Sequence, residues 1–179
     1  MVEPWVVRQW MYRGGFVLIC MTALFFCILP LEVGAGRWPG PDLMLAFAFT
    51  WVLRRPAYVP MLLVGLTFLM GDFIFMRPPG LWAALCVVAV EFLRGREGMS
   101  RDMPFLVEWA TVSVLMFGLA VVYRICLGVF MVDHTSFGLV ILQQISTLSV
   151  YPLVVVASTF LMGVTKISPA EAEQIGYAR

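Results

Sequence analysis

Apolar residues fall into six stretches along this chain of 179 residues, and polar residues, prolines and glycines fill the joins. Proline removes a backbone donor and clashes with the preceding helical turn, so these joins end helices. The pattern predicts one all-α, polytopic membrane domain over residues 14–166, between an N-terminal segment (1–13) and a polar tail (167–179). Its six membrane-spanning helices are expected at about residues 14–33, 42–53, 57–75, 81–93, 104–132 and 137–165.

Composition supports a membrane location. Hydrophobic residues make up 61% of the chain and charged residues 13%, and a soluble domain of this size cannot bury so much apolar surface. The formal charge of +1 gives no basic excess, so we expect no nucleic-acid partner. A single histidine and four scattered cysteines predict no metal site, no disulfide and no cofactor.

Positive charges predict how the chain is oriented, because short cytoplasmic loops are enriched in Lys and Arg. With the N-terminus inside and six crossings, nine basic residues lie inside, two lie outside, and Arg124 falls within a span. We therefore expect both termini in the cytoplasm, with five spans or one re-entrant segment as alternatives. The small residues Val33, Gly34 and Ala35 resemble a signal-peptide cleavage site, but the length of the first stretch favours a retained span.

Two stretches of the chain resemble each other at an offset of 40 residues. The turn at residues 37–40 matches the turn at 77–80, and each precedes a short apolar segment that ends in arginine, at Arg54 and Arg94. From each Pro-Gly turn the segment is about 13 residues, or about 20 Å, whereas a span needs about 20 residues. Short spans in corresponding positions indicate a ligand site in transporters. Independent Pro-Gly turns and a locally thinner bilayer explain the same pattern.

Charged residues inside apolar segments need partners. Asp72 and Arg124 both fall in the outer half of the bilayer, so an ion pair between them is geometrically feasible; a proton or ion site at Asp72 is the functional alternative. Glu91 and Glu108 fall near the inner interface, where Arg94 lies three residues after Glu91 and can pair with it. The candidate structural or partner-contact residues are therefore Asp72, Arg124, Gly71, Glu91 and Glu108.

Motifs for catalysis are missing from the sequence. The only histidine, His134, lies in a turn, whereas a zinc protease needs two histidines on one helix face. The pair Gly71-Asp72 is only a fragment of an aspartyl membrane protease motif, and no phosphate-binding loop occurs. We therefore expect no enzyme. In the tail, residues 168–171 (Ser-Pro-Ala-Glu) have the order of a helix start and predict a short helix over 169–175.

Several turn and helix-end motifs resemble the rod shape-determining MreD family, in its alphaproteobacterial form. They are residues 40–45 (GPDLML), 51–56 (WVLRRP), 58–60 (YVP), 71–73 (GDF), 77–82 (RPPGLW) and 91–94 (EFLR). The detailed resemblance covers residues 40–94, about a third of the chain, and elsewhere only length and span count agree.

This resemblance implies a small bacterial inner-membrane protein of the cell-elongation machinery, which supports cell shape and lateral peptidoglycan synthesis. It implies no catalysis and a partner of the bitopic MreC type. Through that complex it implies contact with the MreB filament, the RodA glycosyltransferase and its penicillin-binding transpeptidase. The implied six-helix fold is similar to the substrate-binding components of vitamin transporters.

The competing hypothesis is a small-molecule-binding component of a transporter. It predicts a polar cavity that opens outward, yet the outer half offers few polar side chains, among them Thr67, Asp72 and Arg124. Whether the protein forms a homodimer stays open.

Overall fold

The computed structural model describes residues 4–29, 39–96, 104–131, 136–160 and 162–164, and these form helices and turns only. The helices are α1 (Pro4–Ile28), α2 (Leu43–Arg54), the 3-10 helix η1 (Pro56–Tyr58), α3 (Met61–Ile74), α4 (Leu81–Gly95), α6 (Phe105–Val129) and α7 (Phe137–Phe160). The segments Trp5–Ile28, Phe105–Val129 and Phe137–Phe160 are long and apolar enough to cross a membrane. The expected all-α class is confirmed, and the chain is a helical membrane protein.

Helix bounds differ from the predicted spans mainly at the two ends of the chain. Helix α1 begins at Pro4 and therefore includes most of the segment 1–13, which the sequence pattern treats as separate. The fifth and sixth segments are shorter than expected, because α6 ends at Val129 and α7 at Phe160. The predicted tail helix over 169–175 lies outside the described residues.

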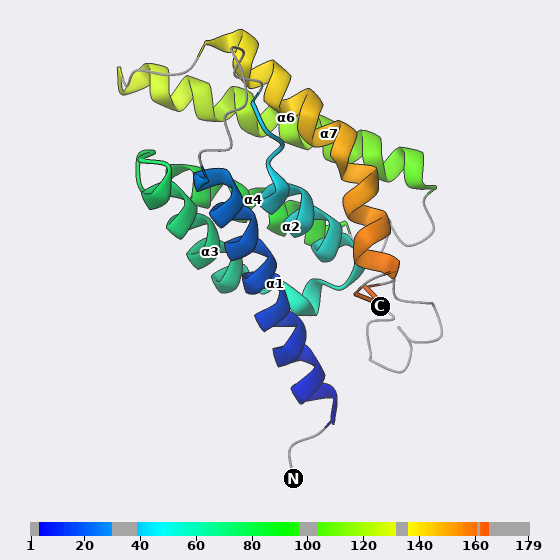
Figure 1. Ribbon diagram of the computed structural model, residues 1–179. Helices are drawn as coiled ribbons and strands as arrows, with labels where there is room; N and C mark the ends of the chain where they lie inside the picture. The colour runs from blue at the N-terminus through cyan, green and yellow to red at the C-terminus, as the bar shows by residue number, and fades with distance from the viewer. Residues whose placement is uncertain (1–3, 30–38, 97–103, 132–135, 161, 165–179) are drawn as a thin grey trace.

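Helix α2 lies at the centre of the bundle, in contact with α1, α4 and α7 (Figure 1). Its 12 residues span about 18 Å, and ten of them are buried, with side chains such as Phe49 and Trp51 fully enclosed. Helices α3 and α4 form a hairpin beside it, and α6 and α7 form a second, longer hairpin (Figure 1). A helix with apolar residues on every side suits the interior of a bundle or contact with lipid, and α2 has the interior position.

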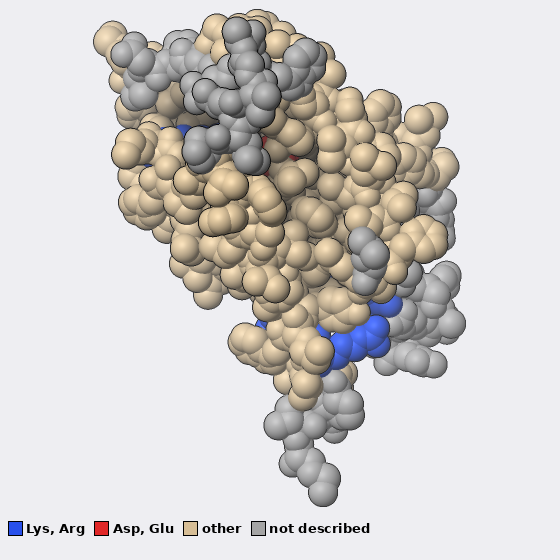
Figure 2. All heavy atoms as spheres, viewed as in Figure 1, with Lys and Arg blue, Asp and Glu red and all other residues tan. Residues whose placement is uncertain are grey.

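The two ends of the bundle differ in chemistry. We call them the Arg54 end, where α2 and α4 finish and α6 starts, and the Asp42 end, where α2 and α4 start and α3 finishes. At the Arg54 end, Arg13 of α1 donates to the Ala57 carbonyl at 3.2 Å and Arg94 of α4 to the Val59 carbonyl at 2.6 Å. In the space-filling view, the largest group of basic atoms lies near the start of α1, and only small areas of charge show elsewhere on this face (Figure 2).

Pro152 interrupts the hydrogen-bond ladder inside α7. Proline has no N–H, so the carbonyl four residues earlier, that of Leu148, loses its usual donor. The indole Nε1 of Trp109 in α6 donates to this carbonyl at 3.1 Å. The proline is therefore tolerated because the neighbouring helix supplies the missing donor.

Candidate functional site

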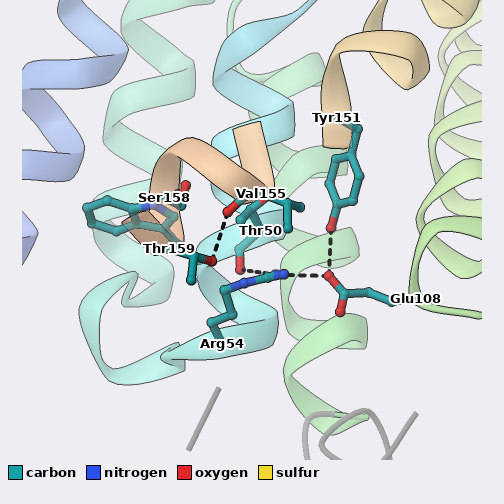
Figure 3. Close-up of polar contacts among 8 residues, drawn as sticks. Thr50, Arg54, Glu108, Tyr151, Val155, Ser158 and Thr159 are labelled. Atoms are coloured by element: carbon teal, nitrogen blue, oxygen red, sulfur yellow. Dashed lines mark hydrogen bonds and ion pairs between the residues drawn. The ribbon is translucent and has the colours of Figure 1, made fainter. Parts of the chain in front are cut away.

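A buried ion pair joins α2 to α6. The guanidinium Nη1 of Arg54 lies 2.9 Å from Glu108 Oε1, and the two side chains are only 6% and 1% exposed (Figure 3). Arg54 Nη1 also donates to the Thr50 carbonyl at 3.3 Å. Arg54 ends α2 and Glu108 lies in the first turn of α6, so each charge also complements the dipole of its own helix.

One hydrogen bond attaches helix α7 to this pair, and a second joins α7 to α2. The Tyr151 hydroxyl donates to Glu108 Oε1 at 3.2 Å, and the Trp51 indole of α2 donates to the Ser158 hydroxyl at 3.1 Å. Figure 3 shows the side chains from the three helices converging around Arg54. The bond from Tyr151 gives Glu108 Oε1 a second partner, and added bonds of this kind help to offset the cost of burying an ion pair. We call Arg54, Glu108 and Tyr151 the Arg54 cluster.

This cluster adds partners for Glu108 that the sequence did not indicate. The sequence pattern places Glu108 near the inner membrane interface, and the structure shows its side chain buried among α2, α6 and α7. The positive-inside rule likewise treats Arg54 as a loop-end charge, yet it is 5% exposed.

Asp72 caps α4 from a neighbouring helix. Its Oδ2 accepts hydrogen bonds from the backbone N–H groups of Gly80 at 3.0 Å and Ala83 at 3.2 Å. Helix α4 needs an outside acceptor because its own N-cap, Gly80, has no side chain and adopts a left-handed conformation (φ 86°). Asp72 thus makes the contacts that serine or aspartate makes at an ordinary N-cap.

The other candidate residues are dispersed. Arg124 lies over the Phe137 ring, 5.4 Å from its centroid, and the carboxylate of Asp72 bonds to α4 and not to Arg124. The expected Asp72–Arg124 pair is therefore replaced by the helix cap. Gly71 marks the close approach of α3 to α1 and α2, since a Cβ there would lie 3.8 Å from side-chain atoms of Leu24 and Met44.

Glu91 and Arg94 form the ion pair that their i, i+3 spacing predicts, with 3.1 Å between Oε1 and Nη1. The two side chains are 38% and 30% exposed, in contrast to Arg54 and Glu108. Arg54 and Arg94 occupy matching positions in the two similar stretches, so equivalent arginines have acquired different surroundings.

A cavity lies at the Asp42 end of the bundle and was not expected from the sequence. A polar lobe of about 430 Å³ and an apolar lobe of about 240 Å³ share several lining residues. The shared residues are Asp42, Phe75, Arg77, Trp82 and Gln143. Asp42 also caps its own helix, because its Oδ1 accepts from the Leu45 N–H at 3.0 Å.

Known proteins offer no further guide to the site. No family model, no curated protein and no solved structure matches the chain. Within the described segments, no cluster of three or more His, Cys, Asp or Glu side chains could hold a metal ion. The interpretation of the site therefore depends on the residues themselves and on the motifs in residues 40–94.

Proposed function

We propose that this protein is a non-catalytic membrane scaffold of the bacterial cell-elongation complex, of the MreD type. In this proposal it lies in the inner membrane and binds an MreC-type bitopic protein. Through that partner it joins the MreB filament, RodA and the penicillin-binding transpeptidase. The proposal rests on the motif resemblance in residues 40–94.

One structural observation supports this function above others: polar residues of the motifs bind other parts of the same bundle. Asp42 and Asp72 cap helices, and Arg54 joins the buried cluster. Glu91 and Arg94 pair on α4, and Arg94 also binds the turn before α3. Residues engaged in this way make a rigid frame, which a scaffold needs in order to present fixed helix faces to its partners.

Membrane topology is part of the proposal. We place six crossings with both termini in the cytoplasm and the Arg54 end inside, which agrees with the arginines gathered at that end. A membrane-impermeant thiol reagent should label a cysteine at Ser136 in intact cells, in a background lacking the four native cysteines. Cysteines at Ser100 and Ser168 should not react, and external labelling at Ser100 would overturn this topology.

The functional test is depletion together with copurification. Loss of the protein should turn rod-shaped cells round, while the purified synthase should still polymerise peptidoglycan. The full chain, coexpressed with an MreC-type protein and extracted in mild detergent, should copurify with it. Retention of the rod shape after depletion would contradict the proposal.

Helix α6 is the face that we assign to the partner. Gly118 is exposed there and a Cβ would meet no atom within 4 Å, so Gly118→Leu should leave the fold intact but weaken copurification. Association in lipid depends on close packing, which a bulky side chain blocks. Gly14→Leu in α1 is the matched control, because its surroundings are equally open. If Gly14→Leu weakens copurification and Gly118→Leu does not, the partner binds α1 instead of α6.

The cavity at the Asp42 end favours a second candidate, a small-molecule-binding component of a transporter. Its lining includes Asp42, Arg77 and Gln143, which is more polar than the sequence led us to expect. Purification of a solitary monomer that carries one small molecule per chain would support this candidate against the scaffold.

A further inference from the structure

The described lining of the polar lobe contains more arginine than carboxylate. Among the described residues, its charged and hydrogen-bonding side chains are Asp42, Arg77, Tyr123, Arg124, Gln143 and Gln144. Two arginines and one carboxylate of this set therefore line the lobe, and that carboxylate already caps α2. Arginine binds phosphate and carboxylate groups through paired N–H donors, so the lobe is suited to an anionic group.

The Arg77 side chain is held at the rim by aromatic rings. Its guanidinium carbon lies 4.9 Å from the centroid of Phe75 and 5.7 Å from that of Trp82. Among the residues that the structure describes, Arg77 has no carboxylate within ion-pair distance. A guanidinium that is stacked in this way keeps its N–H edge available for an anion.

Gln144 gives an independent indication of a ligand. It lines the polar lobe and is 7% exposed, yet its Oε1 has no hydrogen-bond partner in the described part of the chain. Buried acceptors are nearly always paired, so an unpaired one calls for an explanation. A ligand that carries a hydroxyl or N–H donor would satisfy this oxygen.

The apolar lobe continues from the polar one toward α1 and α3. It is lined by apolar side chains that include Leu24, Met44 and Phe68. Cys27 and Phe75, which also line it, are exposed on the outside of the bundle. Together, the two lobes suit a molecule with a charged head and an apolar chain.

We propose that this cavity is a binding site for an anionic amphiphile, a lipid whose head group carries a phosphate and a hydroxyl donor. The phosphate lies between Arg77 and Arg124, the hydroxyl donates to Gln144 Oε1, and the chain enters the apolar lobe. A lipid and a soluble anion could both supply the phosphate. We favour the lipid because the apolar lobe offers a place for its chain. This site goes beyond the scaffold function and does not rest on it.

Native mass spectrometry of the full chain in detergent tests the site with three probes. Dioleoylphosphatidylglycerol has the phosphate, the hydroxyl donors and the chains. Dioleoylphosphatidylcholine lacks the donors and the net charge, and glycerol 3-phosphate lacks the chains. We expect one phosphatidylglycerol per protein, bound about tenfold more tightly than phosphatidylcholine, which lacks both the hydroxyl donor for Gln144 and the net negative charge. It should also bind at least about tenfold more tightly than glycerol 3-phosphate, because burial of about two methylene groups alone contributes that factor.

Variants locate the binding on the protein. Arg77→Gln should weaken phosphatidylglycerol binding by about tenfold or more, because it removes a charge-assisted hydrogen bond. Gln144→Leu should weaken it by about two- to tenfold, because the lost bond is between neutral groups. The matched control is Arg96→Gln, because Arg96 also lies over an aromatic ring, 4.3 Å from the Phe92 centroid, but at the other end of α4. Thermal unfolding without lipid shows whether each variant is folded, and the partly exposed Arg77 carries the test if Gln144→Leu does not fold.

Three results would overturn the proposal. If Arg96→Gln weakens binding as much as Arg77→Gln, the lipid is held by general surface charge. If phosphatidylcholine, which carries the same phosphate, binds as tightly as phosphatidylglycerol, the polar lobe recognises neither the hydroxyl donor nor the net negative charge. If glycerol 3-phosphate binds as tightly as the lipid, the site takes a soluble anion and the apolar lobe is not used. None of these results depends on cell shape or on the MreC-type partner, so they leave the scaffold function to its own test.

Discussion

Replacing Glu108 by glutamine should destabilise the protein strongly while changing almost no volume. The variant leaves the Arg54 guanidinium buried at 6% exposure without its carboxylate. Loss of one partner of a buried pair costs about 3–5 kcal/mol, and at this low exposure solvent screening does not reduce that figure. For a chain of this size, about 2–4 °C per kcal/mol converts the loss into a fall in Tm of roughly 6–20 °C.

The chain provides its own control for this prediction. Glu91→Gln makes the same chemical change in a pair whose side chains are 38% and 30% exposed. Exposed pairs contribute about 0.2–1 kcal/mol, so Glu91→Gln should lower Tm by only a few degrees. The difference between the two glutamine variants then measures the effect of burial.

A double-mutant cycle completes the test. The combination Arg54→Met with Glu108→Gln removes both charges, and the remaining apolar and amide groups need no counter-charge. We expect it to be at least about 2 kcal/mol more stable than the sum of the single losses predicts, in the range found for directly contacting residues. Thermal unfolding in mild detergent, followed by circular dichroism, measures each variant. Simple additivity, or equal losses for Glu108→Gln and Glu91→Gln, would refute the buried pair.

The remaining predictions concern the Asp42 end. Asp72→Ala should lower the free energy of unfolding by about 0.5–2 kcal/mol, the usual value of an N-cap. Adding Arg124→Leu should not restore stability, because the two residues do not pair. If unfolding experiments show that the second change restores stability, the two residues do pair. Gly71→Ala should be tolerated or stabilise by up to about 1 kcal/mol, whereas Gly80→Ala should destabilise because its φ is 86°. Equal Tm values for the two alanine variants would contradict this.

Helix positions could be predicted from the sequence because each depends on residues close together in the chain. Pro56, with the prolines and glycine at 78–80, ends apolar stretches, and the observed α2 and α4 begin within one residue of the expected starts. The Glu91–Arg94 pair is local in the same sense, since three residues of helix bring the two side chains together.

The partners of Asp72 and Arg54 could not be found in this way. We expected Asp72 to pair with Arg124 only because both fall at a similar depth in the membrane. A similar depth does not show which helices are neighbours. A signal was present, because a helix that starts at Gly80 lacks a side-chain cap and Asp72 lies just before the same turn. Arg54 and Glu108 are 54 residues apart, and only the packing of both α2 and α6 against α4 and α7 brings them together.

The hydrogen bond from the Trp109 indole to the Leu148 carbonyl, which Pro152 leaves without its usual donor, has a mechanical consequence. Glu108 directly precedes Trp109 in α6, and it accepts a hydrogen bond from Tyr151 of α7. Tyr151 lies three residues, less than one turn, after Leu148. The two bonds fix the axial register of the hairpin, because a slip of one turn, about 5.4 Å, would break both. Breaking both bonds would cost about 2–4 kcal/mol, so we expect α6 and α7 to move together as one rigid unit during a conformational change.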